Sequence, residues 1–137
     1  MEAIAERLTD ERGFVYRYRS ADGLAGQEGT FAICTFWLAE CLAMVGETER
    51  AREIFERLLG CANDVGLLSE EIAPSTGDLL GNFPQAFTHV GLVNAAWAIS
   101  QAERGLRQPN EARQRTATVR GEATPQATNR AVRRRAE

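Results

Sequence analysis

The stretch TFAICTFWLAECLAMVGETERAREIFERLLGCA, residues 30–62, decides the fold, because its two halves carry opposite patterns. The first half is apolar on nearly every side, which is typical of a helix that is buried all round. The second half repeats apolar residues every three or four positions, with charged residues between them. Gly46 lies between the halves and suits the end of a helix. The stretch therefore predicts one helix from Thr30 to Gly46 and a second from Thr48 to Ala62.

The second of these helices has one apolar side and one charged side. The apolar side is formed by Ala51, Ile54, Phe55, Leu58, Leu59 and Ala62. The charged side is formed by Glu49, Arg50, Arg52, Glu53, Glu56 and Arg57. Glu53 stands one turn before Arg57, which is a favourable pair on a helix surface. A fully buried helix followed by a half-buried one predicts a two-layer helical array, in which inner helices line a core or cavity and outer helices face water.

The rest of the chain adds two more helices to this prediction. Residues 2–10 form a short helix, and the alternating aromatic and basic residues of RGFVYRYRSADG predict an extended segment after it. Three glycines make residues 22–29 a loop. The last helix runs from about Gln85 to Arg104, ends at Gly105, and is again apolar on most sides. The predicted fold class is therefore all-α, with about four helices arranged as inner and outer pairs.

Residues 107–137 differ in composition from the rest of the chain. They contain eight Arg and three Glu, and no aromatic side chain. Such a segment buries too little apolar surface to order itself. We therefore expect a domain over residues 1–106 and a disordered, Arg-rich tail over 107–137. The three arginines at 133–135 suggest nucleic acid, but without aromatic residues beside them a solvated terminus with no nucleic-acid partner is the preferred interpretation.

Composition also argues against several other classes of protein. No apolar run reaches the roughly 20 residues that a membrane-spanning helix needs, so no membrane partner is predicted. The acidic N-terminus lacks the basic and apolar regions of a signal peptide, which favours a cytoplasmic location. The three cysteines, Cys34, Cys41 and Cys61, include no CxxC pair and are expected to be buried free thiols. The sequence predicts neither a metal nor a cofactor.

Two loops that precede the inner helices carry the candidate chemistry. The first is DGLAGQEGTF (22–31), and the second is GLLSEEIAPSTGDLLGNFPQAFTH (66–89), which ends at the only histidine of the chain. The acids in these loops are Asp22, Glu28, Glu70, Glu71 and Asp78. Because both loops lead into inner helices, we expect them to open at the same end of the array, on the rim of its cavity. Glycines that let the backbone approach a ligand, together with polar and aromatic groups, suit a sugar.

The runs EGTFAICTFWLAECLAMVGETERAREIFERLL and NDVGLLSEEIAPSTGDLLGNFPQAFTHVGLVNAA resemble the C-terminal part of glycoside hydrolase family 15. The similarity is strongest to the bacterial glucoamylase- and trehalase-like branch and extends over roughly residues 5–101. The resemblance implies that the helices are a partial (α/α)₆ toroid. It also implies hydrolysis of an α-glucosidic bond with inversion, with an α-glucoside or a glucan end as the substrate.

The resemblance implies roles for individual residues. Glu70, which follows Ser69, stands at the position of the family's general base, the carboxylate that takes a proton from the attacking water. In an inverting pair the two carboxyl groups stand about 6.5–9.5 Å apart, which leaves room for that water. Glu71 is expected to point elsewhere, paired with an arginine or in contact with substrate. Glu28 and Gly29 match an EG pair that is expected to bind substrate on the neighbouring rim.

Other positions are similar to the family's pattern in part. Phe83, Gln85 and His89 match an NFPQAF-H run that supports the base loop and the cavity wall. For His89 we expect a hydrogen-bonded wall residue rather than a catalytic one. Ala73 departs from the aspartate that the branch often has before Pro74, so any contact made by that aspartate is lost while the base remains.

The family's general acid, by contrast, lies in an upstream motif that has no counterpart in this chain. Four helices are also too few to close the barrel. We therefore expect the chain to be inactive alone, since loss of general-acid catalysis costs about 10²–10⁴-fold by itself. Two kinds of protein partner stay open, a complementary N-terminal chain and a second copy through self-association.

Two further alternatives concern the tryptophans and the class of protein. Trp37 and Trp97 could stack on a sugar, but their places on apolar helices favour packing in the core. The chain could also be a helical interaction module or a complementing subunit without catalysis. The helix pairs superficially resemble a solenoid repeat, but no second copy follows at a fixed period.

Overall fold

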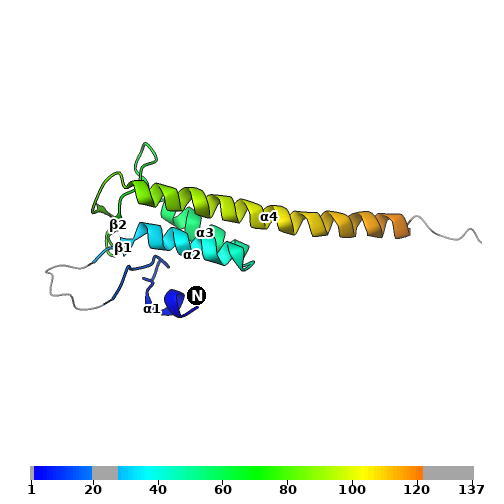
Figure 1. Ribbon diagram of the computed structural model, residues 1–137, viewed down its shortest axis with the longest axis horizontal. Coiled ribbons are helices and arrows are strands. Elements are labelled where there is room, and N and C mark those ends of the chain that lie inside the picture. Colours follow the sequence, from blue (N-terminus) through cyan, green and yellow to red (C-terminus); the bar gives the residue numbers. More distant parts are fainter. Residues whose placement is uncertain (1, 20–27, 122–137) are drawn as a thin grey trace, which may run out of the picture. The chain divides into compact units, whose positions relative to one another are not determined.

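The computed structural model describes residues 2–19 and 28–121, with side chains described up to residue 105 (Figure 1). The chain divides into two compact units, Met1–Gly105 and Leu106–Glu137. Asp22 of the first candidate loop and the arginines at 133–135 lie outside the described residues. No helix in the described ranges is both long enough and apolar enough to span a membrane.

Helices α2 (Ala32–Met44) and α3 (Thr48–Leu59) form the centre of the first unit, as the sequence predicted. Gly46 has a φ of +91° in the turn between them, a conformation that suits glycine. The rings of Phe36 on α2 and Phe55 on α3 lie 5.6 Å apart at an angle of 57°. The core around them includes Leu42, Ala51, Ile54, Leu58 and Leu68.

Helix α4 (Ala86–Gly121) packs its first turns against this pair of helices. Gly91 makes the close approach possible, because a Cβ atom there would lie 3.2 Å from side-chain atoms of both Ile33 and Phe36. The predicted end of this helix at Gly105 is wrong, since the backbone stays helical to Gly121. The expectation of a disordered tail over residues 107–137 stays a prediction, and residues 122–137 lie outside the described ranges.

A small antiparallel sheet makes the all-α prediction wrong in part. Strands β1 (Thr30–Phe31), β2 (Glu71–Ile72) and β3 (Leu79–Leu80) pair in that order. Each strand has two residues, too few for an alternating pattern to mark it in the sequence. The unit is therefore mostly helical, with a three-stranded sheet at the end where α2 and α4 begin (Figure 1).

The N-terminal segment begins with α1 (Glu2–Arg7), which ends before the predicted residue 10. The residues that follow are extended in part, as predicted, and Thr9 pairs with Val15 in an antiparallel bridge. Arg12 forms an ion pair with Asp10 at 2.9 Å and donates a hydrogen bond to the Ala73 carbonyl at 3.1 Å. The N-terminal segment is therefore fastened to the loop that follows β2.

Helix α2 is buried on most sides, with eight of its 13 residues buried, but not all round as predicted. The prediction that α4 is buried on most sides is wrong, since it leaves Phe87, Val90, Val93 and Trp97 exposed. Trp37 on α2 is 51% exposed and Trp97 on α4 is 63% exposed, so neither tryptophan is packed in the core. Of the cysteines, Cys34 and Cys61 are half-buried and Cys41 is exposed, which corrects the expectation of three buried thiols.

Candidate active site

The sheet brings the two candidate loops together. Phe31 of β1 stands opposite Glu71 of β2, and Thr30 stands opposite Ile72. The Thr30 hydroxyl donates to the Ile72 carbonyl at 3.0 Å. As a result, the residues just before β1 and those at the start of β2 lie at the same end of the helices. The structure thus places all four predicted site residues, Glu28, Gly29, Glu70 and Glu71, at this end.

Glu70 is held from both its backbone and its side chain by Asn82. The backbone N–H of Glu70 donates to the Asn82 carbonyl at 3.0 Å. In the other direction, the Asn82 backbone N–H and its Nδ2 donate to Oε2 of Glu70 at 3.1 and 2.9 Å. Both hydrogen bonds reach the same carboxylate oxygen of the half-buried side chain, and among the described residues none reaches Oε1. This arrangement fixes the direction of the carboxylate.

The backbone at Gly81 makes this contact possible. Gly81 has a φ of +71°, and a Cβ atom there would lie 2.9 Å from Oε2 and 3.0 Å from Cβ of Glu70. A larger residue would therefore meet the Glu70 side chain and would also strain the backbone.

Gly29 has the corresponding relationship with Glu71. A Cβ atom at Gly29 would lie 2.8 Å from both Cβ and Oε2 of Glu71, and the Gly29 N–H donates to Oε2 at 3.3 Å. Because Gly29 has no side chain, the Glu71 side chain can lie directly against its backbone. Gly29 was predicted to bind substrate, and this role stays a prediction.

The ion pair with an arginine is formed by Glu28, whereas the prediction placed an arginine beside Glu71. The arginine expected beside Glu71 pairs with Glu28 instead, with Nη2 of Arg17 and Oε1 of Glu28 3.0 Å apart. The same guanidinium lies over the ring of Phe31, 5.0 Å from its centre. Among the described residues, the hydrogen bond to the Glu71 carboxylate comes from the Gly29 N–H.

Burial raises the pKa of Glu71 above its ordinary value. The hydrogen bond from the Gly29 N–H opposes this shift, the carboxylates of Glu28 and Glu70 add to it, and the charge of Arg17 opposes it. The carboxyl group of Glu71 therefore holds its proton more tightly than a freely solvated glutamate does.

Residues at the start of α4, and Gln85 just before it, form hydrogen bonds with the backbone of the two residues that precede Glu70. The Gln85 N–H donates to the Leu68 carbonyl at 3.0 Å, and the buried hydroxyl of Thr88 donates to the Ser69 carbonyl at 3.0 Å. His89 uses both ring nitrogens. Its Nδ1 lies 2.7 Å from the Gln85 carbonyl, and its Nε2 accepts from the Leu68 N–H at 3.3 Å. A carbonyl can only accept, so Nδ1 carries the proton.

His89 is hydrogen-bonded, as expected, and its place in the wall of a cavity stays a prediction. The sequence did not predict the hydrogen bonds that Asn82 forms with Glu70 and that Thr88 forms with Ser69. Thr88 offered one signal, since it is a hydroxyl within an apolar helix. The only signal at Asn82 is its position directly after Gly81, and a Gly-Asn pair is compatible with many kinds of turn, so it did not predict a contact with Glu70.

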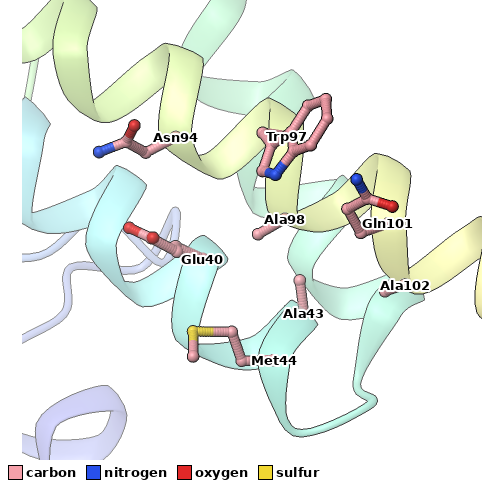
Figure 2. A pocket seen from close by; sticks show the side chains of 8 residues that line it. All are labelled: Glu40, Ala43, Met44, Asn94, Trp97, Ala98, Gln101 and Ala102. Carbon is pink, nitrogen blue, oxygen red and sulfur yellow. The ribbon is translucent and has the colours of Figure 1, made fainter.

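A pocket lies between α2 and α4, apart from these acids. Its volume is about 540 Å³, and none of the four predicted site residues lines it. Figure 2 shows Glu40 and Met44 on its α2 side and Asn94, Trp97 and Gln101 on its α4 side.

Comparison with known proteins identifies the family. The model of glycosyl hydrolases family 15 matches residues 1–97. The chain therefore belongs to glycosyl hydrolases family 15. No solved structure matches it.

Several curated relatives are named trehalase. The chain is 54% identical over 104 residues to the trehalase of Mycolicibacterium smegmatis, covering 74% of this chain and 15% of the relative. It is 49% identical over 118 residues to the trehalase of Mycobacterium tuberculosis, covering 80% and 17%. It is 46% identical over 91 residues to the trehalase of Thermoplasma volcanium, covering 66% and 15%. The chain thus spans less than a fifth of the length of these relatives.

Proposed function

We propose that this chain is the part of a trehalase-like glycoside hydrolase that carries the general base, Glu70. The observation that supports the proposal is the pair of hydrogen bonds from Asn82 to Oε2 of Glu70, because no described residue donates to Oε1, the oxygen proposed to take the proton. The substrate class is an α-glucoside, and trehalose is favoured because the relatives are named trehalase. In this proposal the helices are a partial (α/α)₆ toroid whose rim carries the acids.

The proposed step is an inverting hydrolysis. Oε1 of Glu70 removes a proton from water, and the water oxygen attacks the anomeric carbon from the side opposite the leaving group. The bond from that carbon to the glycosidic oxygen breaks, and that oxygen takes a proton from a general acid supplied by another part of the family domain. Glu28 and Gly29 on the neighbouring rim, and Glu71 beside Glu70, contact sugar hydroxyl groups.

The arrangement around Glu70 suits this task. A general base has to be ionised and aimed in one direction. The two donors on Oε2 are both from Asn82, its backbone N–H and its side-chain amide. They restrict rotation of the carboxylate, so Oε1 points in a fixed direction.

The proposal is tested in a chimera, the M. smegmatis trehalase in which the matching segment is replaced by residues of this chain. We expect the chimera to hydrolyse trehalose, and Glu70→Gln to lower its kcat by about 10²–10⁴-fold with a small effect on KM. Asp78→Asn, at an exposed acid of the same loop, is the matched control and is expected to retain activity. Full activity in the Glu70→Gln chimera would exclude Glu70 as the base.

The chain by itself is expected to release no glucose from trehalose, maltose or starch. The reason is that the proposed reaction needs an acid as well as a base, and no general acid is assigned to this chain. Robust turnover by the isolated chain that disappears in Glu70→Gln would contradict this part of the proposal.

A further inference from the structure

One side of the first unit exposes large apolar side chains from two neighbouring helices. These side chains, which we call the α2–α4 face, are Trp37, Cys41, Met44, Phe87, Val93 and Trp97. Met44 is 75% exposed, Phe87 71% and Trp97 63%. The two helices meet at the pocket of Figure 2, which Met44 and Trp97 both line. Folded monomers seldom leave so many large apolar groups together in water.

Charge separates this face from the ordinary water-facing surface of the same unit. The outer side of α3 carries six charged residues between Thr48 and Leu59. In contrast, α2 carries one, Glu40, and α4 carries no Asp, Glu, Arg or Lys between residues 86 and 102. Helices that face water are usually charged on that side. The α2–α4 face is therefore built to be covered.

The spacing on α4 indicates what kind of structure would cover it. Phe87, Val90, Asn94, Trp97 and Gln101 follow one another at steps of three and four residues, so they form one stripe along the helix. Such a stripe accepts the side chains of another helix between its own. Three polar groups at the pocket, Glu40, Asn94 and Gln101, offer hydrogen bonds that would fix the register of that helix.

We propose that the α2–α4 face docks against helices of the remaining part of a family 15 domain, on the same polypeptide or on a separate one. The trehalases that match this chain have more than four-fifths of their length outside the matching region, so the family supplies further chain to cover the face. The proposal goes beyond the proposed function, because docking requires neither Glu70 nor catalysis.

The test uses this chain and the M. smegmatis trehalase from which the matching segment has been deleted, produced together in one cell. We expect the two chains to purify as a one-to-one complex. In that complex, alkylation of the exposed thiol of Cys41 is expected to slow by about tenfold or more, since a covered thiol is inaccessible. Cys41 lies on the same side of α2 as Trp37 and Met44, so its labelling reports on the face directly.

Two variants of the face and one matched control make the test specific. Val93→Asp and Trp97→Asp each place a charge in the proposed interface and are expected to weaken the complex by at least about 30-fold, as at other interface hot spots. Val65→Asp makes the same change at a valine that is 70% exposed in the loop between α3 and β2, and is expected to bind normally. Circular dichroism of each isolated chain checks that the helices stay folded.

Each other result overturns the proposal. These results are recovery of no complex, a complex that tolerates both face variants, and a homodimer of this chain that the face variants abolish. The last result would assign the face to a second copy of this chain. Because binding is measured without substrate, a failure here is distinct from a failure of Glu70 as the base.

Discussion

Glu70 and Asn82 are twelve residues apart in the sequence and joined by three hydrogen bonds, one from the backbone of Glu70 and two onto its Oε2. The backbone bond lies just beyond the antiparallel pairing of β2 with β3, in which Glu71 stands opposite Leu80. The other two bonds fix the carboxylate. The strand pairing and the proposed chemistry therefore depend on the same few atoms, which makes the turn around Gly81 the most sensitive part of the site.

Asn82→Ala in the trehalase chimera is expected to lower kcat by about tenfold or more while changing KM little. The side-chain donor to Oε2 is lost, so the proposed base rotates more freely, and misplaced catalytic groups cost rate rather than binding. Steady-state kinetics on trehalose measures the effect. Thr76→Ala removes an exposed hydroxyl that bonds only within its own turn and serves as the control. Unchanged kcat in Asn82→Ala would show that the hydrogen bonds from Asn82 are structural only.

Gly81→Ala is expected to destabilise the chain more than Gly66→Ala does. Both glycines have positive φ, +71° and +80°, so each alanine carries a similar backbone cost of about 1–2 kcal/mol. At Gly66 a Cβ atom meets nothing within 4 Å, whereas at Gly81 it would lie 2.9 Å from Oε2 of Glu70. Urea unfolding of the two variants separates the contact with Glu70 from the backbone cost. Equal losses would mean that the Glu70 side chain moves away without a penalty.

Thr88→Val is expected to lower the free energy of unfolding by about 1–3 kcal/mol. The substitution keeps the shape of the side chain but leaves the buried Ser69 carbonyl without its donor. Thr88→Ser, which retains the hydroxyl, is expected to lose less. Chemical denaturation followed by circular dichroism provides the comparison, and a Thr88→Ser variant as unstable as Thr88→Val would point to lost packing instead of the lost hydrogen bond.

Glu71→Gln is expected to stabilise the chain at neutral pH and to have no effect in acid. The pKa of Glu71 is raised in the folded state, chiefly by burial, so the folded protein holds this proton more tightly than the unfolded chain does. The resulting stabilisation is complete below the unfolded pKa of about 4.3 and disappears as the pH rises through the folded value. Glutamine retains an acceptor for the Gly29 N–H and carries no charge.

Urea unfolding of wild type and Glu71→Gln between about pH 3 and 8 tests this prediction across both pKa values. The variant should have the higher midpoint at the upper end and the same midpoint at the lower end. Glu11→Gln removes an exposed acid and corrects for the change in net charge. A variant that is less stable than wild type at neutral pH would contradict the stated effect of burial.

The regular helices could be predicted from the sequence because their signals are local. The spacing of apolar and charged residues predicted that α3 begins at Thr48, as it does. The predicted end, Ala62, lies three residues beyond the observed end at Leu59. The position of α2 was likewise predicted to within two residues at each end. The strands could not be predicted, because two residues are too few to show an alternating pattern and β1 pairs with a strand about forty residues further along the chain.

The site could be predicted only in part, for the same physical reason. Glycine-rich loops before apolar helices indicated where the acids would gather. The partners of those acids, namely Asn82 with Glu70 and Gly29 with Glu71, come from contacts between separate segments. The exposed tryptophans were missed because an apolar run does not show which side of its helix packs against the core.

The central claim is that Glu70 activates the water that attacks the sugar. Its most direct test is the product that the Glu70→Ala chimera forms from trehalose in the presence of azide, an anion that attacks without first losing a proton. If Glu70 is the base of an inverting reaction, azide restores turnover, and proton NMR identifies β-glucosyl azide as the product. Activity that azide does not restore, or a glucosyl azide with the α configuration, would contradict this account.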